Sequence, residues 1–270
     1  MSGAGNDFVV VDNRDGQIND PGPFAVKVCH RRFGIGADGV LMVERHDSAA
    51  FTMKYYNADG SNAGMCGNGG RCIAKFAFDN KIVTGQRFIF EGFGHLYTAE
   101  RISSDEYRLA MKDPFGYQQD QVLEIDGKHI VSNYLNTGTD HAVVFMDGNT
   151  VLGSLNTMEV IRIGSAIRYH QTYKPLGVNA NFVSQLEANS IQIRTYERGV
   201  EDETLACGTG SVASALLSSL RYGMKSPIKV QVQSGEFLQI GFERTENSFR
   251  HVTLQGSAVN VFNGMIDLDL

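Results

Sequence analysis

The sequence lacks the features by which membrane-spanning, secreted and nucleic-acid-binding proteins are recognised. It has no run of 18 or more apolar residues, and its N-terminus has no charged segment followed by an apolar one, the marks of a membrane helix and a signal peptide. The 24 Lys and Arg residues are outnumbered by 30 Asp and Glu, for a formal net charge of -6, whereas nucleic-acid-binding proteins carry clustered Lys and Arg. We therefore expect a cytoplasmic protein that binds neither membranes nor nucleic acid.

Cysteines are few, and their spacing argues against two common uses. Cys29, Cys66, Cys72 and Cys207 include no Cys-x-x-Cys pair, so a structural zinc site is not expected. Without a secretion signal, they are better interpreted as thiols than as a disulfide framework. Cys29 and Cys72 are expected to be small buried apolar side chains.

Cofactor motifs are missing as well. There is no Gly-Lys-Ser or Gly-Lys-Thr P-loop, and Gly92-Phe93-Gly94 lacks the helix and downstream acidic residue of a dinucleotide-binding fingerprint. No lysine has a context typical of pyridoxal phosphate. We expect a protein that works with neither a cofactor nor a metal ion.

Length and patterning predict a two-domain α+β protein. A chain of 270 residues, 42% hydrophobic and 20% charged, has the size of two domains and enough apolar material for their cores. Helical spacing or cap signals predict helices at 23–32, 68–79, 158–167 and about 210–222. Short apolar or alternating runs predict strands at 8–12, 40–44, 51–56, 87–90, 96–102, 107–111, 121–125, 128–133, 142–146, 180–185, 190–195, 228–234, 237–242, 251–255 and 259–262, with a loop at 196–206. Many short strands beside few helices indicate the α+β class.

Two segments of the chain resemble each other. Each contains a cysteine before a glycine-rich helix start: Cys66-Gly67-Asn68-Gly69 and Cys207-Gly208-Thr209-Gly210. Tyr56 precedes the first cysteine by ten positions and Tyr196 precedes the second by eleven. Gly3-Ala4-Gly5-Asn6-Asp7-Phe8-Val9 likewise resembles Gly177-Val178-Asn179-Ala180-Asn181-Phe182-Val183. The repeat predicts two pseudo-symmetric halves whose cysteine loops meet at the domain interface, where ligand sites tend to lie.

The two cysteine loops have the chemistry of a proton-transfer site. The free N–H groups and dipole of a helix N-terminus bind anions such as carboxylates, and flanking glycines permit close approach. The same field lowers the pKa of a thiol from about 8.5. Thiols on opposite faces of an α-amino acid could remove the α-proton from one face and supply one to the other, which inverts the stereocentre. A pair of unrelated structural cysteines and a redox pair remain alternatives.

Five motifs spread over nearly the whole chain are highly specific when taken together. They are Gly3-Ala4-Gly5-Asn6-Asp7-Phe8, Phe33-Gly34-Ile35-Gly36-Ala37-Asp38-Gly39, Asn57-Ala58-Asp59-Gly60-Ser61, Cys66-Gly67-Asn68-Gly69-Gly70-Arg71-Cys72, and Tyr196-Glu197-Arg198-Gly199 through Cys207-Gly208-Thr209-Gly210. In these motifs the chain resembles diaminopimelate epimerases, which work without a cofactor in the synthesis of lysine and peptidoglycan precursors.

This resemblance implies a homodimer of two-domain subunits, each domain a mixed or antiparallel curved sheet around a central helix. The activity it implies is interconversion of LL- and meso-2,6-diaminoheptanedioate. We place the N-terminal domain, which carries Cys66, at 1–113 plus 256–270, and the C-terminal domain, which carries Cys207, at 114–255.

The resemblance also assigns roles to individual residues. Cys66 and Cys207 match the two acid/base thiols, and His141 and Glu197 match groups that tune thiol pKa. Residues matching positions that hold the substrate, mainly its distal amino and carboxylate groups, are Asn6, Asn57, Asn179, Glu197 and Arg198. Residues matching positions that grip the reacting carboxylate are Gly67, Asn68, Gly208 and Thr209.

The sequence departs from the family pattern in three places. The usual Gly-Asn-Pro-His is Gly138-Thr139-Asp140-His141 here, so Thr139 replaces an amide that commonly contacts the distal end of the substrate. Gly39 replaces the glutamine of a Gly-x-Asp-Gln variant and removes a possible substrate contact. Relatives generally begin with a few strand residues before the first glycine motif, so we expect the first strand to be missing or trimmed.

Two other functions remain open from the sequence. The first is another two-thiol racemase, acting on proline, hydroxyproline or histidine. The second is a thiol-redox or amino-acid-binding protein of the same fold without turnover. Arg198 with Asn57 and Asn179 favours a substrate with a distal zwitterion, because arginine suits a carboxylate and asparagine an ammonium group.

Overall fold

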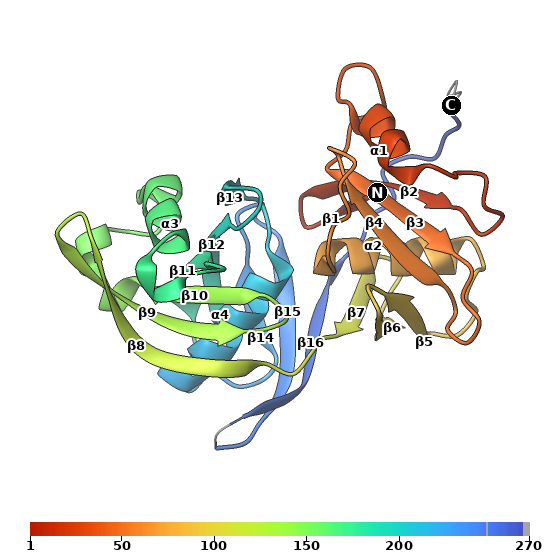
Figure 1. The fold of residues 1–270 in the computed structure, drawn as a ribbon. Coiled ribbons are helices and arrows are strands. Elements are labelled where there is room, and N and C mark those ends of the chain that lie inside the picture. The colour runs from red at the N-terminus through yellow and green to blue at the C-terminus, as the bar shows by residue number, and fades with distance from the viewer. Residues whose placement is uncertain (247, 267–270) are drawn as a thin grey trace. The chain divides into compact units, whose positions relative to one another are not determined.

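The chain forms two compact units in the computed structural model, which describes residues 1–246 and 248–266. Unit 1 consists of Met1–Ala110 and the segment from Gln255 onward, and unit 2 of Met111–Leu254. In Figure 1, unit 1 begins in red and unit 2 runs from yellow-green through green to blue. The described part of each unit combines a mixed sheet with two α-helices, which confirms the α+β class.

In unit 1 the sheet curves around one helix. Its strands, in their order along the sheet, are β1 (Ser2–Gly3), β2 (Asn6–Asp12), β3 (Gly39–Glu44), β4 (Thr52–Asn57), β5 (Arg87–Gly92), β6 (His95–Arg101) and β7 (Glu106–Ala110). The β2/β3 and β4/β5 pairs are parallel, and the other neighbours in this series are antiparallel. Helix α2 (Gly67–Asp79) contacts β1, β2 and β3 at one end of this order and β6 and β7 at the other. Helix α1 (Pro21–Cys29) packs on β3 and β4 through Phe24, Ala25 and Val28.

Unit 2 repeats this plan on a larger scale. Its strands, in sheet order, are β8 (Phe115–Ile125), β9 (Lys128–Asn136), β10 (Asp140–Phe145), β11 (Asn179–Glu187), β12 (Ser190–Glu197), β14 (Ile228–Gln231), β15 (Phe237–Arg244) and β16 (Phe249–Ser257), whose last residues belong to unit 1. Helix α4 (Gly208–Tyr222) contacts strands from β9 to β15, and Figure 1 shows these strands curving around it. Helix α3 (Val160–Arg168) packs on β8, β11, β12 and β13 (Asp202–Thr204).

The inner helix α4 is buried on nearly all sides, although it is rich in serine. Ser211, Ser214, Ser218 and Ser219 are fully buried. The hydroxyl of Ser218 donates to the carbonyl oxygen of Ser214 at 2.7 Å, and that of Ser219 to Leu216 at 2.7 Å. Side chains this small let the surrounding strands approach closely, and those of Ser218 and Ser219 are satisfied by their own helix. Oγ of Ser214, by contrast, is buried without a hydrogen-bond partner in the described part of the chain. The burial of nearly all sides of α4 explains why the helix shows little amphipathic pattern.

The order of elements confirms the pseudo-symmetric halves but corrects the alignment between them. Unit 1 runs parallel β2/β3, then β4, then α2, then β5 parallel to β4. Unit 2 runs parallel β10/β11, then β12, then α4, then β14 parallel to β12. Strand β2 therefore corresponds to β10, and β3 to β11. The predicted match of Gly3-to-Val9 with Gly177-to-Val183 is wrong by one strand, because both segments are glycine-containing turns that enter parallel strands.

Strand register then gives the equivalent positions of the two units. Tyr56 lies opposite Val40 on β3, and Tyr196 lies opposite Ala180 on β11. The parallel partners one position earlier are Phe8 for Gly39 and His141 for Asn179. Gly39 is therefore equivalent to Asn179, and Phe8 to His141. Two residues earlier in each chain segment, Asn6 is equivalent to Thr139. In the helices, the second residues Asn68 and Thr209 are equivalent.

Three predicted elements need correction. The strand expected at 259–262 is absent, since Val259 makes an isolated bridge to Ser2 and β1 is too short to extend it. The loop expected at 196–206 is partly a hairpin, because β12 continues to Glu197 and pairs with β13. The first helix begins at Pro21 and ends at Cys29, where His30 takes an extended backbone conformation.

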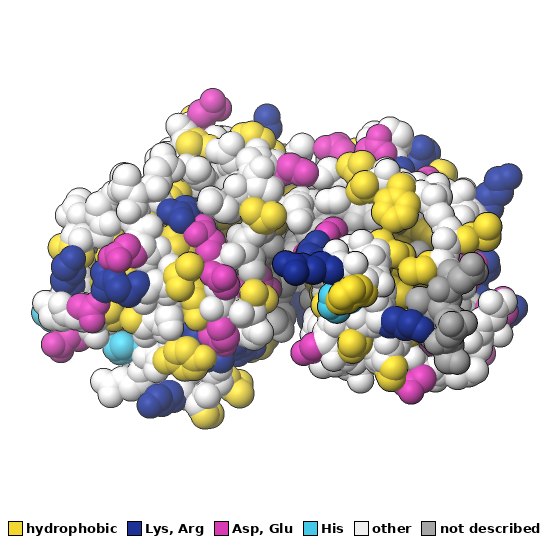
Figure 2. Space-filling view, turned by 90° about the horizontal axis from the view of Figure 1, so that it is seen from above, with side chains coloured by type: hydrophobic (Ala, Val, Ile, Leu, Met, Phe, Trp, Pro, Cys, Tyr) yellow, Lys and Arg dark blue, Asp and Glu magenta, His cyan; other side chains and the backbone are white. Residues whose placement is uncertain are grey.

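The described surface carries charges of both signs. On the face drawn in Figure 2, Lys and Arg side chains lie among Asp and Glu side chains. Within residues 1–246 and 248–266, no helix is both long enough and apolar enough to cross a membrane.

Candidate active site

Both candidate thiols cap the inner helix of their unit. Cys66 is the N-cap of α2 with φ -109° and ψ 124°, and Cys207 is the N-cap of α4 with φ -114° and ψ 111°. Cys207 is 5% exposed and Cys66 is half-buried, and neither forms a disulfide. The next residues, Gly67 and Gly208, begin the helix. Each thiol therefore lies beside first-turn N–H groups, which lack intrahelical acceptors.

In unit 1, four side chains form a continuous hydrogen-bonded line, which we call the asparagine chain: Arg71, Asn68, Asn6 and Asp38. Nη2 of Arg71 donates to Oδ1 of Asn68 at 2.8 Å, and Nδ2 of Asn68 donates to Oδ1 of Asn6 at 2.5 Å. Nδ2 of Asn6 then donates to Oδ2 of Asp38 at 3.0 Å. The structure thus joins two predicted site residues, Asn6 and Asn68, and every donor in the line points away from Arg71.

Arg71 brings a positive charge into the first turns of α2. Its side chain is fully buried, and its other N–H groups donate to the carbonyl oxygens of Gly67 and Ser257, each at 3.2 Å. A buried guanidinium bonded to first-turn groups adds to the positive end of the helix dipole. Both fields favour a negative charge near Cys66.

Asn57 lies at the end of β4, opposite Gly39. Its Nδ2 donates to Oγ of Ser61 at 3.0 Å, and its backbone N–H donates to the carbonyl oxygen of Ser61 at 2.9 Å. Asn57 is therefore ordered by its own turn, separately from the asparagine chain. Any side chain at Gly39 would meet the backbone oxygen of Tyr56, with a Cβ at 2.5 Å, so close strand packing requires glycine there.

In unit 2, Cys207 has polar neighbours of two kinds. Sγ lies 3.7 Å from Oγ1 of Thr209, and Cys207 also shares a side-chain hydrogen bond with Glu197. Burial raises the pKa of Glu197, while hydrogen bonds from Thr204 and Cys207 oppose that shift. Oγ1 of Thr204 donates to Oε2 of Glu197 at 3.0 Å. A carboxylate with a raised pKa is a better acceptor for a thiol proton than an ordinary surface glutamate.

His141 is fully buried within the sheet of unit 2. Its Nδ1 lies 3.1 Å from Nδ2 of Asn181, and its Nε2 lies 2.9 Å from Oγ1 of Thr139. Burial lowers the pKa of His141 to about 3, so the ring is neutral near pH 7. Both ring nitrogens have partners, and His141 acts on its surroundings as a neutral hydrogen-bonding group rather than as a cation.

Asn179, Arg198 and Asp140 form the third cluster of unit 2. Oδ1 of Asn179 accepts the backbone N–H of Arg198 at 2.9 Å, and its Nδ2 donates to the carbonyl oxygen of Asp140 at 2.9 Å. Nη1 of Arg198 donates to Oδ2 of Asp140 at 3.0 Å. Asp140 also accepts bonds from Tyr134 and Asn136. The predicted substrate-binding arginine is therefore already paired with a carboxylate of its own chain.

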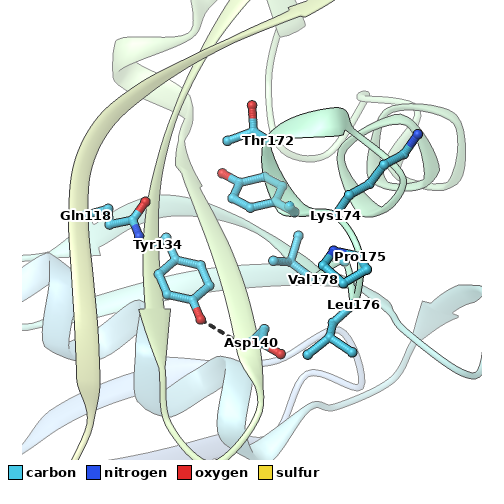
Figure 3. Close-up of a pocket in the computed structure, with 10 residues that line it drawn as sticks. Gln118, Tyr134, Asp140, Thr172, Lys174, Pro175, Leu176 and Val178 are labelled. Atoms are coloured by element: carbon cyan, nitrogen blue, oxygen red, sulfur yellow. Dashed lines mark hydrogen bonds between the residues drawn. The ribbon is translucent and has the colours of Figure 1, made fainter.

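A cavity of about 240 Å³ lies beside this cluster in unit 2. Figure 3 shows the hydroxyl of Tyr134 directed at the carboxylate of Asp140, with Leu176 and Pro175 on the opposite side. Nη1 of Arg198 donates at 2.9 Å to the carbonyl oxygen of Gly177, which also lines the cavity. The Asp140–Arg198 pair thus lies at the edge of a hollow with both polar and apolar lining.

We call the surroundings of Cys66 in unit 1 and of Cys207 in unit 2 the two half-sites. Four residues that organise them were missed by sequence reasoning: Asp38, Arg71, Asn181 and Gly210. Asn181 stands two residues after Asn179 on β11, so strand alternation places both on one face, a signal that was available. Asp38 and Arg71 lie within family motifs, but nothing in their local sequence indicates which side chains they contact. Gly210 packs against Oδ1 of Asn181 and Sγ of Cys207. Within the described residues, no group of three or more His, Cys, Asp or Glu side chains could hold a metal ion.

Solved structures share this fold at low sequence identity. A phenazine biosynthesis protein of the PhzF family from Bacillus anthracis aligns with a TM-score of 0.71 at 12% identity, over 98% of this chain and 95% of that one. A hydroxyproline epimerase from Agrobacterium vitis aligns with a TM-score of 0.66 at 15% identity, over 88% of this chain and 78% of that one. At this identity the likeness concerns the fold.

Sequence comparison goes further than fold. The family model for diaminopimelate epimerase matches residues 1–106 and 133–260. A diaminopimelate epimerase from Chlorobaculum tepidum is 41% identical, over 99% of this chain and all of that protein, and one from Aquifex aeolicus is 37% identical, over 98% and 96%. Together with the two thiol-capped helices, these matches show that the chain belongs to the diaminopimelate epimerase family.

Proposed function

We propose that this protein interconverts LL- and meso-2,6-diaminoheptanedioate by a cofactor-independent reaction in which Cys66 and Cys207 are the acid and the base. The observation that carries the proposal is that both thiols occupy the N-cap of a buried helix and that the matching sequences are named diaminopimelate epimerases. One thiolate takes the α-proton, and the other thiol delivers a proton to the opposite face of the same carbon. In the reverse direction the two thiols exchange roles.

The half-sites supply what this reaction needs. The reacting carboxylate is bound by the first-turn N–H groups at Gly67, Asn68, Gly208 and Thr209, whose helix dipoles also stabilise negative charge developing on the α-carbon. Glu197 accepts the proton of Cys207 through the hydrogen bond they share. His141 acts as a neutral group that shapes the surroundings of this thiol.

Distal recognition is assigned to Asn6, Asn57, Asn179, Glu197 and Arg198. The guanidinium of Arg198 suits the distal carboxylate, and amide and carboxylate oxygens suit the distal ammonium group. Asn179 holds the backbone of Arg198 in place. We further propose that the protein is a cytoplasmic homodimer, on the strength of the family resemblance.

Solvent-exchange experiments test this function. The reduced protein is incubated in deuterium oxide with diaminopimelate, proline, hydroxyproline, histidine and other amino acids, and deuterium at the α-carbon is followed together with stereochemistry. We expect exchange and inversion with diaminopimelate. Exchange with a cyclic amino acid instead would identify another two-thiol racemase. Binding without exchange would identify a non-catalytic protein. Reducing conditions are needed because a Cys66–Cys207 disulfide would remove both bases.

A further inference from the structure

The amide of Asn181 has one orientation in unit 2, and that orientation determines where the proton of His141 lies. Oδ1 of Asn181 accepts the hydroxyl of Thr195 at 3.0 Å, and Nδ2 donates to the carbonyl oxygen of Ala142 at 3.0 Å. The atom facing Nδ1 of His141 is therefore the donor Nδ2, at 3.1 Å. Since Nδ1 of the neutral ring accepts this bond, the ring proton is on Nε2.

The remaining hydrogen bonds then have a single direction. Nε2–H of His141 donates to Oγ1 of Thr139 at 2.9 Å. The hydroxyl of Thr139 donates to Oγ1 of Thr209 at 3.2 Å. Thr209 accepts that bond, so its own proton is left to point at Sγ of Cys207, 3.7 Å away. Each hydroxyl accepts one bond and donates the next.

We propose that Thr139 is a positioning residue that couples buried His141 to Thr209, so that the Thr209 hydroxyl acts as a hydrogen-bond donor to the Cys207 thiolate. This inference rests on the proposed function, because it treats Cys207 as one of the two acid/base thiols. No proton is transferred along this series of hydrogen bonds from Asn181 to Cys207. Its effect is orientation and polarisation, and successive hydrogen bonds of one direction strengthen each other.

The surroundings of Cys207 give this donor a defined task. Glu197 contacts the same thiol and is the titratable group that accepts its proton. Asp140 and Arg198 are the charged groups that act on His141, and their effects on the ring are opposed. The line from Asn181 to Thr209 contains no charged group near pH 7. It therefore stabilises the thiolate without adding a second proton acceptor beside Glu197.

Unit 1 contains a contact equivalent to the Thr139–Thr209 hydrogen bond, which indicates that this bond is a feature of the repeated fold and not a chance contact. The position equivalent to Thr139 is Asn6, and the position equivalent to Thr209 is Asn68. These two side chains are also hydrogen-bonded to each other, at 2.5 Å. Both units therefore connect a residue at or immediately before the start of a parallel strand, β2 or β10, to the second residue of the inner helix.

The test measures the reactivity of each cysteine separately. Intact protein is alkylated with iodoacetamide over a range of pH, and the modified peptides of Cys207 and Cys66 are quantified by mass spectrometry. Thr139→Val removes the hydroxyl at nearly constant shape, and Thr139→Ser keeps it. We expect Thr139→Val to raise the pH midpoint of Cys207 alkylation by about 0.5 to 1 unit, equivalent to roughly three- to tenfold less thiolate below the midpoint. Thr139→Ser should restore the wild-type midpoint, and Cys66 should be unaffected in both variants.

Thr137→Val is the matched control. Oγ1 of Thr137 donates to the backbone carbonyl oxygen of Thr209 at 3.0 Å, not to its side chain, so this variant should leave the Cys207 midpoint unchanged. Equal Cys207 midpoints in Thr139→Val and Thr139→Ser, or equal shifts in Thr139→Val and Thr137→Val, would overturn the proposal. Alkylation requires no turnover, so a midpoint shift without deuterium exchange would refute only the proposed function.

Discussion

The two half-sites share a skeleton and differ in the direction of their hydrogen bonds. In unit 1, Asn68 on the helix donates to Asn6 on the strand side. In unit 2, the strand-side residue Thr139 donates to Thr209 on the helix. The donors of unit 1 start from a buried cation, Arg71, and end at Asp38. The donors of unit 2 start from the amide of Asn181 and end at the thiol of Cys207.

This difference shows how a duplicated fold can prepare two like residues for unlike states. The field at Cys66 comes from the helix and from Arg71, whose charge does not change near neutral pH. Cys207 instead lies between a carboxylate of raised pKa and an oriented hydroxyl. The helix start at Cys66 thus carries a permanent positive charge in its first turns, whereas Cys207 has a proton acceptor and a neutral donor beside it. An epimerase needs one thiolate and one thiol at each turnover. The two cysteines here have different surroundings with which to reach those two protonation states.

The largest expected effect comes from removing either thiol. Cys66→Ala and Cys207→Ala should each lower the rate of inversion of diaminopimelate by about 10² to 10⁴-fold, the range for loss of a general acid or base. Chiral chromatography of the product measures inversion. Cys29→Ala, at a buried cysteine on α1, is the control and should leave the rate unchanged. A variant lacking one of the two thiols that still inverts at the wild-type rate would confine the chemistry to a single half-site.

The second prediction compares equivalent glycines. A Cβ at Gly210 would overlap Oδ1 of Asn181, which is bonded in place, whereas one at Gly69 would meet the end of the Leu41 side chain at 3.2 Å. Gly210→Ala should therefore lower the free energy of unfolding by about 2–4 kcal/mol through overpacking and a displaced hydrogen bond. Gly69→Ala should change it by about 1 kcal/mol or less, since helix propensity offsets the contact.

Urea unfolding, with hydrogen exchange of the α2 and α4 amides measured separately, would report each helix. If the two variants lost equal stability, the rigidity assigned to the Asn181 side chain would be wrong.

The third prediction concerns acid sensitivity. His141 has a folded-state pKa of about 3 against 6.5 in the unfolded chain, so the unfolded state binds more protons between these values. The stability that depends on neutral His141 is complete above about pH 6.5 and is lost as the pH falls toward 3. Between pH 7 and 5 the wild type should lose about 2 kcal/mol more than His141→Gln, which keeps a neutral amide donor.

The contribution of Glu197 has the opposite sign, because its raised pKa makes stability fall as the pH rises above about 4.5. Glu197 is present in the wild type and in His141→Gln, so its contribution cancels in the difference between their stabilities. Unfolding curves at pH 5, 6 and 7 would measure that difference. Parallel pH profiles would mean that His141 is not held neutral.

The smallest expected effect tests the Asp140–Arg198 pair. Asp140→Asn removes the negative charge paired with Arg198, so the guanidinium charge becomes available to a substrate carboxylate, although Nη1 keeps its bond to the carbonyl oxygen of Gly177. The KM for diaminopimelate should fall by about two- to fivefold with kcat unchanged, because uniform binding is strengthened. Asp147→Asn, which breaks an exposed pair with Arg221, is the control. A higher KM in Asp140→Asn would mean that Asp140 holds Arg198 in its binding position.

Much of the site could be read from local sequence. The positions of Cys66 and Cys207 at helix N-termini were predicted from a few residues, because glycine-rich turns preceded helical spacing, and α2 and α4 begin one and about two residues earlier than predicted. Strands with strong apolar runs, such as β3, were also found from local sequence. The short strand β13 was missed because its formation depends on pairing with β12 rather than on its own residues. The equivalence of β2 and β10 was missed because it depends on sheet order.

Sequence alone determined the residue types, the doubled thiol motif and the resemblance to the family, since these depend on neighbours along the chain. Tertiary structure alone decided the partners of Thr139 and His141. The family resemblance presented Thr139 as the replacement of an amide, while the fold shows its hydroxyl between His141 and Thr209. The tertiary structure also decided that Arg198 is paired with Asp140. Hydrogen-bond direction depends on which groups from distant strands meet, and only the packed sheet and helix bring them together.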